Sequence, residues 1–166
     1  MPEKETLERA HEDAAEGKAP STQAGEFVKE EMDHIREGKH GARSTKQAIA
    51  IGLSKARRAG VKLKPPAKSR ASARTRKQAA RDLRKGKSGN RKTSAKRSRA
   101  TENALKREGH SAASPSALSK QARSAAKKRS ASSRSAAAKK AARTKGPAER
   151  RAAAKKAAST RARKAA

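Results

Sequence analysis

The feature that most constrains this chain is the position of its large apolar residues, nearly all of which lie before Pro65. From Pro65 to the end of the sequence, only Leu83, Leu105 and Leu118 are large apolar side chains. A core needs many such side chains, because each stabilises the fold by about 1.5–3 kcal/mol when it is buried. We therefore expect any tightly folded part to be small and to lie before Pro65.

Charge also divides the chain into segments. Residues 1–40 hold 6 bases and 11 acids, residues 41–64 hold 7 bases and no acid, and residues 65–166 hold 33 bases and 4 acids, within a formal net charge of +31. A segment so rich in one charge and so poor in apolar side chains is typical of a disordered chain. We predict an acidic N-terminal helix over residues 1–20, a helical hairpin module over 21–64, and a Lys/Arg/Ala/Ser-rich low-complexity tail over 65–166. The predicted fold class is mostly α, with a small helical head and a long, largely disordered basic tail that has helical propensity.

Two helices are predicted in the acidic part of the chain. The first lies in ETLERAHEDAAEG, and Gly17 is placed to end it. The second begins at Pro20 and runs to Glu37, with apolar residues such as Met32 and Ile35 at helical spacing.

A third helix is predicted over residues 45–59. Ser44 and Gln47 stand at its N-cap and N3 positions, as in a capping box. Gly60 is placed to end it, and Val61 is placed to make the hydrophobic contact that often accompanies such an end. The predicted buried face carries Ile49, Leu53 and Ala56. The ten candidate core residues of the head are Leu7, Phe27, Val28, Met32, Ile35, Ile49, Ile51, Leu53, Val61 and Leu63.

Within the tail, one segment carries a helix start signal. Ser114 and Pro115 are placed as N-cap and N1 of a helix in SPSALSKQARSAAKK. Like charges three and four residues apart oppose helix formation there, so we expect the helix to form when an anion neutralises the tail.

Catalysis finds no support in the sequence. The four histidines follow no metal-binding spacing, so we interpret His11, His34, His40 and His110 as solvated surface residues. The acids of the second helix are interpreted as its solvent face: Glu26, Glu30, Glu31, Asp33 and Glu37. Without cysteine there is no thiolate nucleophile and no Cys-based zinc site. We expect no enzyme activity, cofactor, metal or small-molecule substrate.

The tail indicates a polyanionic partner. Duplex DNA carries one charge per about 1.7 Å of its axis, and each phosphate that Lys or Arg neutralises releases counterions. Single-strand binders usually stack bases on aromatic rings, and residues 65–166 contain none. We therefore predict a histone-like, nucleoid-associated protein of the cytoplasm that binds and compacts duplex DNA non-specifically. No apolar run is long enough for a membrane helix, so no membrane partner is expected.

The candidate nucleic-acid-binding residues are bases of the third helix and of the tail. They are Lys46, Lys55, Arg57, Arg58, Arg74, Arg76, Lys77, Arg84, Lys85, Arg91, Lys92, Lys96, Arg97, Arg99, Arg123, Lys127, Lys128, Arg129, Arg134, Lys139, Lys140, Arg143, Lys145, Arg150, Arg151, Lys155, Lys156, Arg161, Arg163 and Lys164.

Two other functions use the same residues. An RNA-binding or ribosome-associated protein would use the tail in the same way. A sequence-specific transcriptional regulator would read bases with helix 45–59, whose polar positions include Gln47. In each case the helical head is a candidate surface for self-association or for a protein partner.

Two resemblances add to these expectations. With its KK and RK pairs in Ala and Ser, and with Ser114–Pro115 and Gly146–Pro147, the tail resembles the C-terminal tails of linker histones and the histone-like proteins of bacteria. That resemblance implies non-specific duplex binding and compaction. Residues 25–60 resemble a short domain of unknown function in small basic bacterial proteins, which implies a bacterial source. The matching residues are Lys39, His40, Gly41, Ser44, Lys46, Gln47, Ala48, Ile49, Ala50, Ile51 and Leu53.

Overall fold

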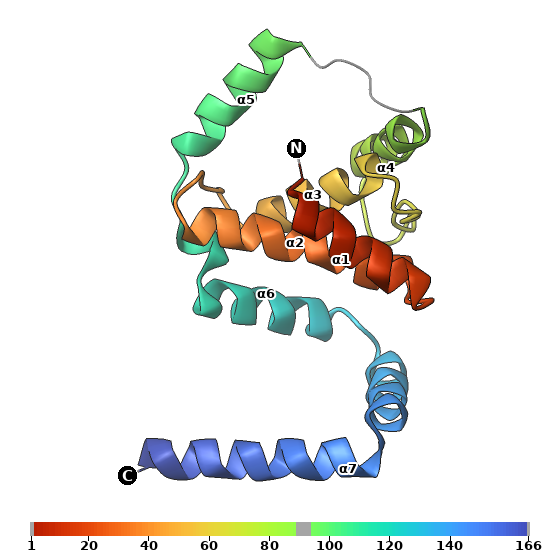
Figure 1. The fold of residues 1–166 in the computed structure, drawn as a ribbon, viewed down its shortest axis with the longest axis vertical. Helices are drawn as coiled ribbons and strands as arrows, with labels where there is room; N and C mark the ends of the chain where they lie inside the picture. The colour runs from red at the N-terminus through yellow and green to blue at the C-terminus, as the bar shows by residue number, and fades with distance from the viewer. Residues whose placement is uncertain (1, 89–93, 166) are drawn as a thin grey trace. The chain divides into compact units, whose positions relative to one another are not determined.

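The computed structural model describes residues 2–88 and 94–165, and their regular structure is entirely helical (Figure 1). The elements are α1 (Lys4–Ala15), α2 (Pro20–Arg36), α3 (Thr45–Arg58), α4 (Ala73–Lys87), α5 (Ala95–Lys106), the short 3-10 helix η1 (Ser111–Ala113), α6 (Pro115–Lys127) and α7 (Ala131–Ala165). The mostly α class is confirmed. The chain forms two compact units, Met1–Gln121 and Ala122–Ala166.

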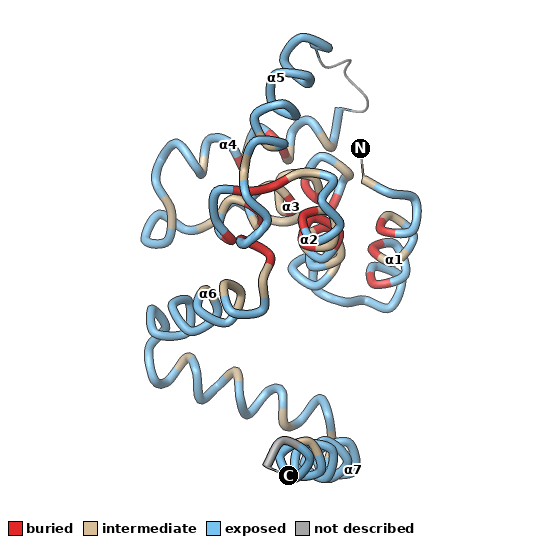
Figure 2. Tube along the Cα trace, turned by 90° about the vertical axis from the view of Figure 1, so that its left-hand side faces the viewer, coloured by how far each residue is buried: buried red, intermediate tan, exposed pale blue. Residues whose placement is uncertain are grey.

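The first unit is built on α2, which contacts both α1 and α3. Figure 2 shows that the buried residues gather along these three helices and the adjoining loops. One hydrophobic cluster joins α1, α2 and α3 around Phe27. A second cluster joins α2 and α3 to η1 around Met32 and Ile35. Small side chains supply much of both clusters: Ala10, Ala24, Ala42, Ala48, Ala56, Ala112 and Ala113 are buried.

The α2 and α3 backbones approach each other closely at Gly52. A Cβ atom at this position would lie 2.7 Å from the Cα of Val28 and 2.9 Å from the carbonyl oxygen of Phe27. Glycine is therefore required for this helix contact. Of the ten predicted core residues, Phe27, Met32, Ile35 and Val61 are buried, Leu7, Val28, Ile49, Leu53 and Leu63 are partly buried against the clusters, and Ile51 is half-buried outside both.

The start of α3 follows the predicted cap with one difference. The Ser44 hydroxyl accepts a hydrogen bond from the Gln47 amide at 3.3 Å. The Gln47 side chain accepts from the amide of Arg43 at 3.0 Å, rather than from Ser44 as in a capping box. Two backbone donors at the helix entrance are satisfied in either arrangement.

The predicted end of α3 is confirmed. Gly60 has φ 101°, a left-handed conformation that glycine adopts without a steric penalty. Its amide donates to the Arg57 carbonyl at 3.2 Å, and the Val61 amide donates to the Ala56 carbonyl at 3.1 Å. These two bonds make a Schellman motif, and Val61 and Ala56 share a hydrophobic cluster as expected.

The expectation of a largely disordered tail is wrong. Most described residues after Pro66 are helical, in α4 to α7. Ala, Lys and Arg are strong helix formers, and serines cap three of these helices. Ser72 accepts from the Thr75 amide, Ser114 from the Ala117 amide and Ser130 from the Ser133 amide, each at 3.2 Å. Local propensity and capping thus outweigh like-charge repulsion, and Ser114–Pro115 begins α6 as predicted.

The first unit continues beyond Pro65 because later segments complete its core. The η1 residues Ala112 and Ala113 are buried against α2 and α3, and the Thr45 hydroxyl donates to the Ala112 carbonyl at 2.7 Å. In addition, α4 packs on α3. The compositional break at Pro65 is therefore not the boundary between the two compact units.

Candidate nucleic-acid interface

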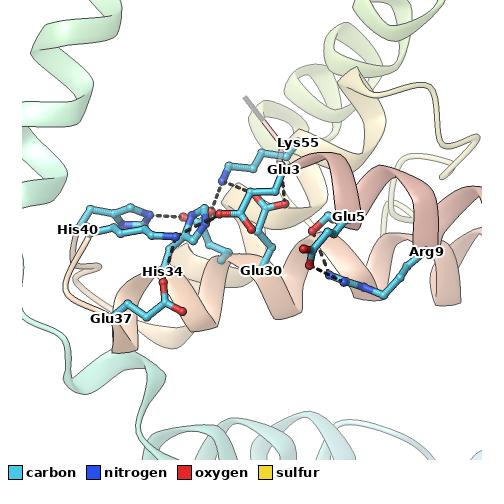
Figure 3. Close-up of polar contacts among 11 residues, drawn as sticks. Glu3, Glu5, Arg9, Glu30, His34, Glu37, His40 and Lys55 are labelled. Carbon is cyan, nitrogen blue, oxygen red and sulfur yellow. Dashed lines mark hydrogen bonds and ion pairs between the residues drawn. The ribbon is translucent and has the colours of Figure 1, made fainter.

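Lys55, one of the predicted α3 contacts, has partners inside the protein. Its ammonium lies 3.2 Å from Glu30 Oε1 and 2.7 Å from Glu31 Oε2 (Figure 3). Burial alone would lower the pKa of Lys55, but the contact with Glu31 and the charge of both glutamates raise it above its ordinary value. Lys55 is thus a charged internal residue that neutralises buried carboxylates.

Arg57 and Arg58 also bind neighbouring groups. Arg57 is 7% exposed and donates to the carbonyls of Leu63 and Leu53 at 3.2 and 3.3 Å. Burial lowers its pKa, and the charge of Asp82 opposes that shift. The half-exposed Arg58 donates to Asp82 at 2.9 Å, which fixes α4 on α3.

The α3 surface therefore offers little to a sequence-specific reader of bases. Of its predicted polar positions, Lys46 is exposed, while Gln47 caps the helix. A recognition helix needs several side chains that are free to reach base edges. The internal contacts of Lys55, Arg57 and Arg58 speak against the regulator alternative.

The cations of α4 and α5 are mostly at the surface. Those predicted and found exposed are Arg74, Lys77, Arg84, Lys85, Lys96, Arg97 and Arg99. Arg76 is half-buried, and its Nε has no hydrogen-bond partner. Arg91 and Lys92 lie outside the described residues. Between α3 and the second unit, the prediction left out nine exposed cations: Lys62, Lys64, Lys68, Arg70, Arg81, Lys87, Lys106, Arg107 and Lys120.

The second unit presents a long cationic surface. All 15 of its bases up to residue 163 are exposed, and Glu149 is its single acid. They are Arg123, Lys127, Lys128, Arg129, Arg134, Lys139, Lys140, Arg143, Lys145, Arg150, Arg151, Lys155, Lys156, Arg161 and Arg163. Lys164 belongs to α7, but its side chain is outside the described residues. Figure 2 shows α7 exposed along nearly its whole length.

α7 is cationic on all sides and broken near its middle. At 3.6 residues per turn, Arg134, Lys139 and Lys140 point to three different sides of the helix. The break is at Gly146, which has φ 66° and ψ 173° and precedes Pro147. Each half of α7 is therefore a short rod that can meet an anionic surface from any side.

The structure corrects two predictions, one about the acids of the second helix and one about the histidines. Glu30 and Glu31 are buried rather than on its solvent face, because Lys55 reaches them from α3. His34 and His40 are mostly buried as well, with side chains 13% and 15% exposed. Of the remaining residues in these two groups, Glu37, His11 and His110 are exposed as expected, whereas Glu26 and Asp33 are half-buried.

The comparison with known families covers the central part of the first unit. Residues 20–69, which include α2 and α3, match a family of unknown function (DUF6496). No curated protein and no solved structure matches the chain. Among the described residues, no helix has both the length and the apolar character needed to span a membrane.

Proposed function

We propose that the protein binds duplex DNA without sequence preference, through the cations of α7 and the neighbouring basic helices. The observation that carries this proposal is the exposure of every described base in residues 122–163. Within that segment no described base forms an ion pair with an acid. Burial or internal pairing would favour a structural role for such cations, as it does for Lys55.

The charge of the second unit matches a linear polyanion. It holds 16 bases and one acid, a net charge of +15. With two phosphates per base pair, this charge neutralises roughly seven base pairs of duplex. Because α7 carries cations on all sides, one helix can also lie between two duplexes. Bridging of this kind would compact DNA, which supports a histone-like role at the nucleoid.

The missing aromatic rings favour a duplex over a single strand. Residues 65–166 contain no Phe, Tyr or Trp on which bases could stack. Charge by itself does not separate duplex DNA from structured RNA, so the experiment must compare the two.

The test measures binding of the full-length protein to two unrelated duplexes and one structured RNA, all of equal length, over a salt series. We expect equal affinity for the two duplexes and a steep linear fall of log affinity with log salt. A tenfold preference for the RNA would replace this proposal with the RNA-binding alternative. A tenfold preference for one duplex would replace it with sequence-specific recognition.

A further inference from the structure

The geometry points to a zinc site in the first unit, formed by Glu31 and His34 of α2, His40 of the following loop, and Glu3 before α1. One ligand atom from each of Glu31, His34 and His40 can be chosen so that the three lie within 4.8 Å of one another. Figure 3 shows the His34 ring beside Glu3 and the His40 ring turned toward the carboxylates next to Lys55. This inference is independent of the proposed DNA binding.

The Glu31 carboxylate needs a partner that the protein does not fully provide. Its side chain is 0% exposed, and neither of its oxygens accepts a hydrogen bond. Lys55 Nζ lies 2.7 Å from Oε2 as an ion pair, and His40 Nε2 lies 3.2 Å from Oε1; neither contact has hydrogen-bond geometry. A buried carboxylate in this state is costly. A cation bound at Oε1 would remove that cost, while Lys55 keeps Oε2.

The His40 ring has the arrangement of a metal ligand. Its Nδ1 lies 3.1 Å from the carbonyl oxygen of Gly41. A proton on Nδ1 donated to that carbonyl leaves the Nε2 lone pair directed toward Glu31. Metal-bound histidines commonly donate their other ring nitrogen to a backbone carbonyl in this way, which fixes the tautomer and the ring orientation.

His34 and Glu3 supply the other side of the site. His34 Nε2 lies 2.8 Å from Glu3 Oε1. In a tetrahedral zinc site, ligand atoms about 2.0–2.2 Å from the ion are about 3.4 Å from one another. The pairs His34–Glu3 and His40–Glu31 are already near that separation. His34 and Glu3 also line a polar surface pocket, through which an ion can enter.

The charge of the cluster calls for a divalent cation. Two sets of charged groups flank the histidines: Glu3 and Glu37 contact Lys39, and Glu30 and Glu31 contact Lys55. With both imidazoles neutral, the cluster has a net charge of −2. One Zn²⁺ would balance it. Two imidazole nitrogens and two carboxylate oxygens suit zinc, whereas Ca²⁺ and Mg²⁺ prefer oxygen ligands alone.

The experiment titrates the full-length protein, without nucleic acid, with Zn²⁺ by calorimetry and with Co²⁺ by visible absorption. We expect one ion per chain and the absorption of four-coordinate cobalt. Loss of a residue that only hydrogen-bonds to a metal ligand weakens metal binding by about 10–100-fold. His34→Gln and His40→Gln each remove a ligand, so each should weaken Zn²⁺ binding by at least this factor, and the double variant should abolish binding. His11→Gln is the matched control, because His11 is exposed on α1 and should leave binding unchanged.

Circular dichroism shows whether a variant that loses Zn²⁺ binding is still folded. We expect the histidine variants to retain the helicity of the parent protein. Glu31→Gln is a weaker test, since it also removes one partner of the half-buried Lys55. Failure of the parent protein to bind Zn²⁺ at micromolar concentration would overturn the inference. Stoichiometric binding that survives in the double histidine variant would overturn it too, because the ion would then lie elsewhere.

Discussion

Neutralising four lysines of α7 tests whether its exposed charge drives binding. Lys139, Lys140, Lys155 and Lys156 are all exposed and lie on both halves of the helix. Their replacement by Gln removes the charges and keeps a residue of similar helix propensity. Replacement of the same four lysines by Arg keeps both charge and helix, and provides the matched control.

The expected loss follows from the number of phosphate contacts removed. Because the cations surround the helix, we expect two to four of these lysines to face a duplex at once. Each lost contact makes the slope of log affinity against log salt less steep by about 0.9, so the slope changes by about 1.8–3.6. With equal binding at 1 M salt, the Gln variant binds about 60-fold to 4,000-fold more weakly at 0.1 M salt.

Fluorescence anisotropy with a labelled random-sequence duplex, read at five salt concentrations, measures both the slope and the affinity. The Arg variant should reproduce the parent slope. An unchanged slope in the Gln variant would refute the assignment of these residues to phosphate contact. An equal loss in the Gln and Arg variants would show that shape, rather than charge, governs binding.

Three further predictions concern the first unit, each measured by urea unfolding followed by circular dichroism. Gly52→Ala should lower stability by about 1–3 kcal/mol because its Cβ would meet the α2 backbone, whereas Gly25→Ala, with nothing near its Cβ, should raise it by about 0.5–1 kcal/mol. Lys55→Met should cost about 3–5 kcal/mol because two buried glutamates lose their ammonium partner, and a similar loss in the exposed control Lys46→Met would contradict this reason. Phe27→Ala should cost about 3–5 kcal/mol because the ring is fully buried, and a loss below about 1 kcal/mol would contradict the described core.

The ends of the helices could be predicted because their signals are local. The bond from Gln47 to Ser44 and the left-handed Gly60 involve residues within a few positions of one another. Among the helices after Pro66, only α6 was predicted by its start signal, because the charge density of the tail favoured disorder. The capping serines at positions 72 and 130 are equivalent signals for α4 and α7.

The core was predicted only in part, because small side chains supply much of it. Ala48, Gly52 and Ala56 recur every four residues and are all buried on α3. A stripe of small residues at this spacing lets a neighbouring helix approach closely. The sequence contains this pattern, which predicts a buried face centred on Ala48 and Gly52, one residue before Ile49 and Leu53.

The cluster around Glu31 could not be predicted from spacing. Its partner Lys55 lies 24 positions later, and the two meet only because α2 and α3 pack together. Sequence reasoning about acids on a helix face assumes that solvent covers that face. The approach of α3, whose Lys55 reaches both glutamates, reverses that assumption.

The hydrogen bonds that join α2 and α3 to η1 also determine when the first unit can finish folding during synthesis of the chain. Arg36 donates to the carbonyl of Ala113, 77 residues later, and Thr45 donates to that of Ala112, 67 residues later. At a synthesis rate of about 5–20 residues per second, roughly 4–15 s pass between the appearance of Arg36 and that of its partner. The apolar faces of Met32 and Ile35 lack their alanine cover during that interval. Folding of the first unit is therefore completed only after α4 and α5 have been made.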